Sequence, residues 1–247
     1  MKERGNKILK TIDRFIGPII VFAFGLLRSR VIRKNKSEGN TRYLLIKTAA
    51  IGDTILLSSI IQEIKASQPN SSISLLCAKN NYEASKLLDN IDEIIIFDFS
   101  RLLFSLKQLM KLPKFDYVLD FAQWDKISAI ITAFVKSDCK VGFYRKNMYR
   151  HYAYDFYAEH NDNCHEVENY RKLCELVGIK CKKFLPKIRP LLSLRDISPN
   201  KALGENLKEY VVFHMFPGGS LQKLKKWATS NWLELACKIN KEFGYSV

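Results

Sequence analysis

Short apolar runs alternate with amphipathic segments between residues 43 and 143, and this alternation restricts the fold more than any other feature of the sequence. Continuous apolar runs are typical of strands that a parallel sheet buries on both faces. We expect strands at 43–47, 72–77, 93–97, 117–121 and 140–143. The segments between them have apolar residues at helical spacing and predict helices at 53–66, 82–88, 102–111 and 126–135. The order indicates an α/β fold, a parallel sheet with helices on both faces.

The rest of the chain predicts a second domain. We expect 144–164 to be irregular and 166–177 to form a helix that ends at Gly178. Residues 182–208 contain three prolines and are typical of an interdomain connection. Beyond it we expect a strand at 210–214, a helix at 230–243 and the start of another strand at 245–247. Because one strand, one helix and the start of another strand could not bury their own apolar faces, we expect this second domain to be incomplete in the chain.

These patterns divide the chain into three parts. We predict an N-terminal segment at 1–40, a first Rossmann-like domain at 41–195 and the start of a second at 205–247. Over residues 1–40, basic residues outnumber acidic ones by ten to three, and Phe15–Leu27 carries no charge. This apolar run is shorter than the roughly 20 residues of a membrane-spanning helix. It favours a helix lying on an anionic membrane surface, with a helix packed on the protein's own core as the alternative.

Composition and spacing argue against several other classes of protein. The net charge is +15, but aromatic and basic residues do not interleave in an RNA-binding pattern and no recognition helix is evident, so we expect no nucleic-acid partner. The six cysteines form no C-x-x-C pair, and no D-x-D triplet occurs. The spacing of His160, His165 and Glu166 fits no standard metal site. We therefore expect neither a metal nor another cofactor.

The first candidate loop follows the first predicted strand and reads KTAAIGD, from Lys47 to Asp53. In a doubly wound sheet, ligands bind beyond the carboxyl ends of the strands, where this loop lies. Gly52 permits a tight turn and the close approach of a ligand. Asp53 is either the N-cap of the next helix or a catalytic carboxylate, and spacing alone leaves both open. The loop lacks the G-x-G-x-x-G pattern of a dinucleotide site.

The second candidate loop runs from Phe216 to Ser220 and continues into lysines before Trp227. Glycines and a hydroxyl after a strand, followed by lysines and a helix start, are typical of a phosphate-binding loop. A solvated basic turn is the alternative.

Taken in order, several segments resemble glycosyltransferase family 9, the heptosyltransferase-like family, over about residues 43–247. They are IKTAAIGDTILLSSIIQEIKASQPNSSISLL, NIDEIIIFD, FDYVLDFAQ, HEVENYRKLCELVGI and HMFPGGS followed by KKWATSNWLELACKI. The resemblance implies a GT-B fold, in which two Rossmann-like domains of parallel sheet enclose an active site between them.

The resemblance also implies roles for particular residues. Asp53 would be the base that deprotonates the acceptor hydroxyl, and Lys225 would stabilise the departing diphosphate. The donor loop would contribute Gly218, Gly219, Ser220 and Lys223, and the acceptor would meet Lys47, Thr48, Gly52 and His165. The loop before Trp227 is longer than usual in the family, so Lys223 or Lys226 are alternatives to Lys225. Ala228 stands where the family often has proline.

The implied function is transfer, with inversion, of a heptose or related sugar from a nucleotide-diphosphate donor. ADP-heptose is the expected donor, and a lipopolysaccharide core or another lipid-linked sugar is the expected acceptor. The expected location is cytoplasmic, peripheral at the inner face of the inner membrane. The alternative is a non-catalytic, membrane-associated glycan-binding protein with an incomplete donor domain.

Overall fold

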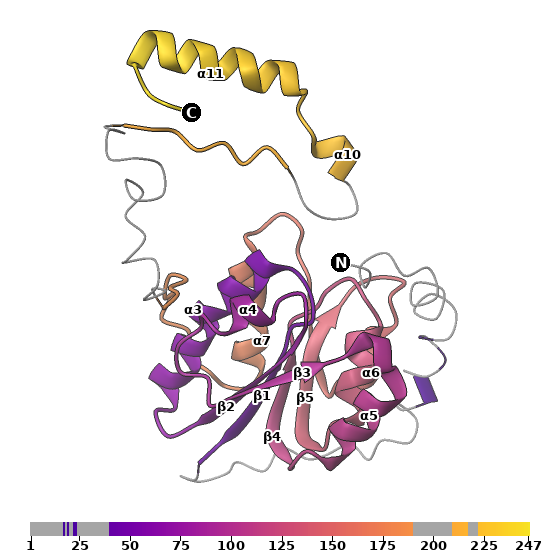
Figure 1. Cartoon of the computed structure of the whole chain (residues 1–247). Helices are drawn as coiled ribbons and strands as arrows, with labels where there is room; N and C mark the ends of the chain where they lie inside the picture. Colours follow the sequence, from indigo (N-terminus) through magenta and orange to yellow (C-terminus); the bar gives the residue numbers. More distant parts are fainter. Residues whose placement is uncertain (1–16, 18, 20–21, 24–39, 190–208, 217–221) are drawn as a thin grey trace. The chain divides into compact units, whose positions relative to one another are not determined.

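The computed structural model describes residues 17, 19, 22–23, 40–189, 209–216 and 222–247 (Figure 1). They belong to two compact units, one within residues 6–189 and the other within 190–247, and each is described by itself. Most of the apolar N-terminal run at 15–27 lies outside the described residues. Within the described residues, no helix has the length and hydropathy needed to cross a membrane. The predicted boundaries at 40, 195 and 205 stay predictions.

The first unit is built on one parallel sheet, as the alternating pattern predicts. Six strands follow the order β3-β2-β1-β4-β5-β6, and each pairs in parallel with its neighbours. The strands are β1 (Arg42–Ile46), β2 (Ser72–Ala78), β3 (Glu93–Phe97), β4 (Phe115–Asp120), β5 (Ser137–Tyr144) and β6 (Phe156–Glu159).

Helices cover both faces of this sheet (Figure 1). One face carries α3 (Ile51–Ser67), α4 (Tyr82–Ser85) and α7 (Glu166–Leu176), and the other carries α5 (Leu102–Lys111) and α6 (Ile127–Phe134). Two short 3-10 helices, η3 (Phe99–Arg101) and η4 (Arg150–Ala153), lie in the connections.

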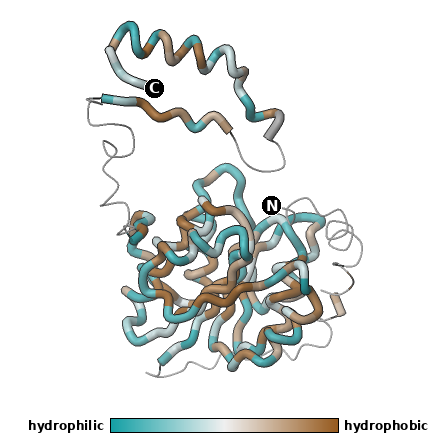
Figure 2. Tube along the Cα trace, viewed as in Figure 1, coloured by the Kyte–Doolittle hydropathy of each residue, from teal (hydrophilic) through white to brown (hydrophobic). Residues whose placement is uncertain are grey.

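Neighbouring residues of one strand enter different cores, because side chains alternate across a sheet. Leu45 of β1 packs with α3 and α7, whereas Leu44 and Ile46 pack with α5 and α6. Both cores are buried, so the four positions of β1 from Tyr43 to Ile46 favour apolar residues. This explains the continuous apolar runs in the sequence, and Figure 2 shows them as hydrophobic strands inside the unit.

The prediction of irregular structure throughout 144–164 is wrong at β6. Its four residues, FYAE, pair with β5 from Val141↔Phe156 to Tyr144↔Glu159. The strand lies at the edge of the sheet and three of its four residues are exposed. An exposed edge strand needs no apolar run, and so it gives no strong sequence signal.

The chain after α7 is tied to the first unit by a buried glutamate. Glu63 of α3 accepts hydrogen bonds from the backbone N–H of Lys182 at 2.6 Å and of Phe184 at 2.9 Å, and pairs with Arg171. Further along, the N–H of Arg189 donates to the carbonyl of Leu87 at 2.7 Å. Residues 182–189, predicted as part of a connection, therefore belong to the first unit.

The second unit contains α10 (Gln222–Lys225) and α11 (Thr229–Phe243). The prediction of a strand at 210–214 is wrong, because among these five residues only Tyr210 forms a β-bridge, which pairs it in parallel with Ser246. No side chain of α11 is buried against the described residues. Among the described residues of this unit, a single bridge and the short helix α10 supply too little surface to cover the apolar side of α11.

Candidate functional site

The site begins where the direction of the sheet changes. From β1 the chain proceeds outward to β2 and β3 on one side, and then returns to β4, β5 and β6 on the other. The carboxyl ends of β1 and β4 therefore flank the topological switch point, where open α/β sheets bind ligands. The residues after β1 include Lys47, and those after β4 include Phe121 and Gln123.

Lys47 joins the two strand ends and holds Asp53. Its buried ammonium donates to the Phe121 carbonyl at 3.1 Å and to Gln123 Oε1 at 3.2 Å, and pairs with Asp53 Oδ2 at 3.1 Å. Two of the three N–H donors of the ammonium are thus hydrogen-bonded inside the protein, and its charge is paired with the Asp53 carboxylate. The Asp53 side chain is 34% exposed, against 3% for that of Lys47. One side of the carboxylate is thus fixed, while the group stays accessible.

Asp53 is not the N-cap of α3. The helix begins at Ile51, its N-cap is Ala50, and no side chain caps it. Asp53 lies in the first turn, where the positive end of the helix dipole favours a carboxylate. The choice between cap and catalytic residue, which spacing left open, is therefore decided against the cap.

The tight turn lies at Ala50 rather than at Gly52, which corrects our expectation. Ala50 has φ 66° and ψ 114°, a conformation that non-glycine residues rarely adopt. A Cβ atom on Gly52 would meet nothing within 4 Å. Gly52 therefore leaves open space beside Asp53 without being needed for the turn.

Asn81, which was not predicted as a site residue, holds the loop between β1 and α3 in place by hydrogen bonds. Its buried amide donates to the Lys47 carbonyl and to Thr54 Oγ1, both at 2.8 Å, and accepts from the N–H of Ala78 at 3.0 Å. Thr48 is buried in the same loop.

A fully buried polar cluster holds the carboxyl end of β4. Asp120 Oδ2 accepts from Arg150 Nη2 at 2.8 Å and from the Tyr154 hydroxyl at 2.6 Å. Burial raises the pKa of Asp120 despite the neighbouring guanidinium. Gly142 leaves room for the Tyr154 ring, since a Cβ there would lie 2.3 Å from its Cζ. The cluster fixes β4 one residue before the Phe121 carbonyl that receives Lys47.

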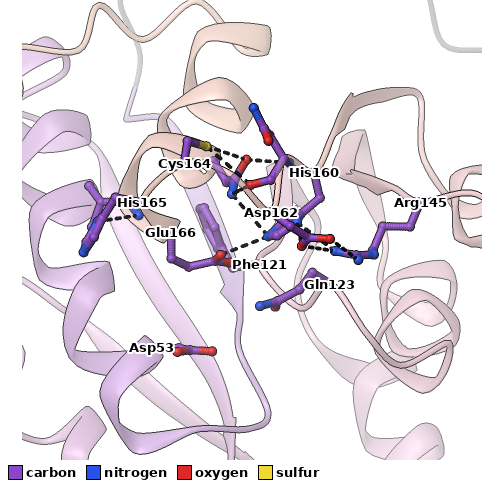
Figure 3. A network of polar contacts seen from close by, with 12 residues as sticks. Asp53, Phe121, Gln123, Arg145, His160, Asp162, Cys164, His165 and Glu166 are labelled. Carbon is purple, nitrogen blue, oxygen red and sulfur yellow. Dashed lines mark hydrogen bonds and ion pairs between the residues drawn. The ribbon is translucent and has the colours of Figure 1, made fainter.

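A second polar network borders the site from β5, the loop after β6 and α7 (Figure 3). Arg145 forms two 2.7 Å hydrogen bonds with Asp162, and its Nη1 lies 2.9 Å from His160 Nδ1. His160 Nε2 lies 2.9 Å from Glu166 Oε2. The hydrogen bonds from Arg145 hold the pKa of Asp162 below its usual value. Arg145 also stacks on exposed Trp124, 3.6 Å from the ring centroid.

The predicted acceptor residues Lys47 and His165 lie in different surroundings. Lys47 is buried, donates to two groups after β4 and pairs with Asp53, so it is placed to hold Asp53; its expected contact with the acceptor stays a prediction. His165 is the N-cap of α7, where Nδ1 accepts from the N–H of Val167 at 3.3 Å. The next residue, Glu166, is the first residue of α7, and its side chain contacts His160 in the Arg145–His160 network.

The predicted donor residues lie in the second unit. Lys225 is exposed at the end of α10, and the backbone of Lys223 lies in the same helix. Gly218, Gly219 and Ser220 lie outside the described residues. Among the residues that the structure describes, no group of three or more His, Cys, Asp or Glu side chains is arranged to hold a metal ion.

Comparison with known sequences decides the family. The model for glycosyltransferase family 9 (heptosyltransferase) matches residues 103–247, more than half of the chain. The chain belongs to glycosyltransferase family 9. This confirms the resemblance found in the sequence. A comparison of this family 9 chain with curated proteins gives no significant match.

Solved structures agree at the level of the fold. A family 9 glycosyltransferase from Veillonella parvula is 16% identical with a TM-score of 0.68, covering 86% of this chain and 63% of its own. E. coli heptosyltransferase WaaC with ADP is 17% identical with a TM-score of 0.63, covering 82% and 64%. E. coli ADP-heptose lipopolysaccharide heptosyltransferase II is 15% identical with a TM-score of 0.60, covering 82% and 62%. The predicted GT-B-type α/β fold is thereby confirmed, and the family 9 chain spans less than two thirds of each of these chains.

Proposed function

We propose that this family 9 chain is an inverting glycosyltransferase that uses Asp53 as its general base. The observation that carries the proposal is the pair formed at the switch point by Lys47 and Asp53. Buried Lys47 holds one carboxylate oxygen at 3.1 Å while the Asp53 side chain stays 34% exposed. A carboxylate that is fixed, accessible and not used to cap its helix is suited to accept a proton from a bound substrate.

In the proposed reaction, an acceptor hydroxyl donates its proton to Asp53 while its oxygen attacks the anomeric carbon of the donor sugar. The bond from that carbon to the diphosphate oxygen breaks, and the nucleoside diphosphate leaves. Lys47 keeps the carboxylate oriented, and the buried Asp120–Arg150 cluster keeps the β4 partners of Lys47 in place. Attack opposite the leaving group inverts the anomeric centre.

The donor is proposed to be a nucleotide-diphosphate sugar, with ADP-heptose as the first candidate. The similar E. coli enzyme WaaC has been solved with ADP and with ADP-2-deoxy-2-fluoro heptose. Lys225 is the proposed partner of the departing diphosphate, with Lys223 and Lys226 as alternatives. Gly218, Gly219 and Ser220 would supply backbone and hydroxyl donors to the phosphates.

The acceptor is proposed to be a lipopolysaccharide core or another lipid-linked sugar. The basic and apolar N-terminal segment at 1–40 supports this choice, because a lipid-linked acceptor lies at a membrane surface. We propose that the enzyme is peripheral at the cytoplasmic face of the inner membrane.

A transfer assay tests the function. The chain is incubated with ADP-heptose and lipopolysaccharide that lacks heptose in its core, and mass spectrometry follows the acceptor. We expect the acceptor to gain one heptose, and UDP-glucose in place of ADP-heptose to serve as the donor control. Binding of lipopolysaccharide without transfer from either donor would contradict the proposal and favour the non-catalytic glycan-binding alternative.

A further inference from the structure

Two buried polar atoms beside Asp53 have no hydrogen-bond partner within the part of the chain that the structure describes. They are Glu166 Oε1 and the hydroxyl of Tyr170. Buried polar atoms are nearly always paired in folded proteins, because an unpaired one is destabilising. Two of them close to a candidate catalytic carboxylate point to a ligand that supplies the missing partners.

Both atoms belong to one face of α7. Glu166 is its first residue and Tyr170 follows four positions later, so their side chains are neighbours on the helix. The Tyr170 ring lies under the site, with the Lys47 ammonium 5.4 Å from its centroid. Burial, together with the negative charges of Asp53 and Glu166, raises the pKa of Tyr170. The Tyr170 hydroxyl is therefore neutral and lies within the electrostatic reach of both carboxylates.

The carboxylate of Glu166 is held in place through one oxygen, while its other oxygen has no hydrogen-bond partner among the described residues. Its Oε2 meets His160 Nε2 at 2.9 Å, and His160 is itself held by Arg145, which is clamped to Asp162 and stacked on Trp124. This support leaves Glu166 Oε1 unused while preventing the carboxylate from turning away. Figure 3 shows the side chains of Asp53, Gln123 and Glu166 reaching the same region from three different elements.

The chemistry of the two atoms selects the ligand. A carboxylate oxygen accepts hydrogen bonds, and a phenol hydroxyl both donates and accepts. A sugar hydroxyl can donate to the first and accept from the second. A phosphate or carboxylate of the acceptor would instead be repelled by Glu166, which forms no ion pair with a lysine or arginine among the residues that the structure describes and contacts only the imidazole of His160.

We propose that Glu166 and Tyr170 form a subsite that binds a neutral hydroxyl of the acceptor sugar, next to the hydroxyl that Asp53 deprotonates. The subsite would orient the acceptor ring, and it would place the anionic groups of the acceptor elsewhere. This inference rests on the proposed function, which it deepens by naming two further acceptor-binding residues.

Tyr170→Phe and Glu166→Gln test the subsite with heptose-free lipopolysaccharide as acceptor and ADP-heptose as donor. Tyr170→Phe removes a hydroxyl that has no partner, so its melting temperature should not fall. The KM for lipopolysaccharide should nevertheless rise about tenfold or more, while the KM for ADP-heptose stays the same. Glu166→Gln can still accept from His160 but presents an amide donor to the subsite, and it should raise the same KM.

Tyr43→Phe is the matched control. The hydroxyl of Tyr43 is bonded to Gln68 at 3.0 Å, at the opposite end of β1 from the site. This variant should lose stability and keep both KM values. An unchanged KM for lipopolysaccharide in both test variants, or a rise in the KM for ADP-heptose instead, would overturn the subsite and leave the proposed function intact. Absence of transfer by the wild type would refute the proposed function itself.

Discussion

At the scale of residues, the site depends on one buried lysine. Lys47 is buried, donates to two groups that follow β4, and forms an ion pair with Asp53. The sequence identified the loop and both residues, but not the ion pair between them, because a lysine's burial cannot be seen from its neighbours in sequence. Likewise, the contact of Glu166 with His160 could not be predicted, since the orientation of residues at a helix start depends on where that helix begins.

Lys47→Met should therefore impair catalysis without removing the base. The neutral side chain no longer holds the Asp53 carboxylate, and misplacement of a catalytic group by about 1 Å can cost on the order of a hundredfold in rate. We expect kcat for heptose transfer to fall by about that factor, measured with saturating ADP-heptose. Lys79→Met is the control, because Lys79 forms an exposed ion pair with Asp98 and exposed pairs contribute little. Equal rates in both variants would argue against the positioning role of Lys47.

At the scale of elements, five strands could be predicted because each reads as an apolar run: β1, β2, β4 and β5 lie inside the sheet and are mostly buried, and β3, at one edge, still has three consecutive isoleucines. The sixth, β6, could not, because it lies at the exposed edge of the sheet. The polar cluster at the end of β4 could not be predicted from the sequence either. Asp120 is 30 residues from Arg150 and 34 from Tyr154 in the sequence, and it meets them only once β4 and η4 are packed.

Gly142→Ala should destabilise the first unit through this cluster. The new methyl group would overlap the Tyr154 ring, which is held in place by its 2.6 Å bond to Asp120. Overpacking of this kind costs about 1–3 kcal/mol, which urea denaturation should detect as a lower midpoint. Gly52→Ala is the matched control, since its methyl group would meet no atom within 4 Å. A midpoint for Gly142→Ala equal to that of the wild type would show that Tyr154 can move without loss.

At the scale of the whole molecule, the sequence predicted the family and the α/β fold because its motifs occur in family order along the chain. The structure says less about the second unit. No side chain of α11 is buried among the described residues, and most of the predicted donor loop lies outside them. Acid sensitivity is a property of the molecule that the structure does predict, through carboxylates with lowered pKa values.

Stability should fall as the pH drops from about 4 towards 2. The hydrogen bond from Lys79 lowers the pKa of Asp98 to about 2, and those from Arg145 lower the pKa of Asp162. A lowered pKa in the folded state gives stability above the unfolded pKa that is lost as these groups protonate. The melting temperature of Asp98→Asn/Asp162→Asn should therefore depend less steeply on pH between 4 and 2 than that of the wild type. Parallel curves would contradict this account.

The most direct test of the central claim is the rate of heptose transfer by Asp53→Asn, with Asp98→Asn as the control for removal of a carboxylate. Asparagine keeps the size of the side chain but cannot accept the proton. The account predicts a fall in kcat of about a hundredfold or more for Asp53→Asn, with unchanged affinity for ADP, and wild-type rates for Asp98→Asn. Transfer by Asp53→Asn within a few-fold of the wild-type rate would show that Asp53 is not the base.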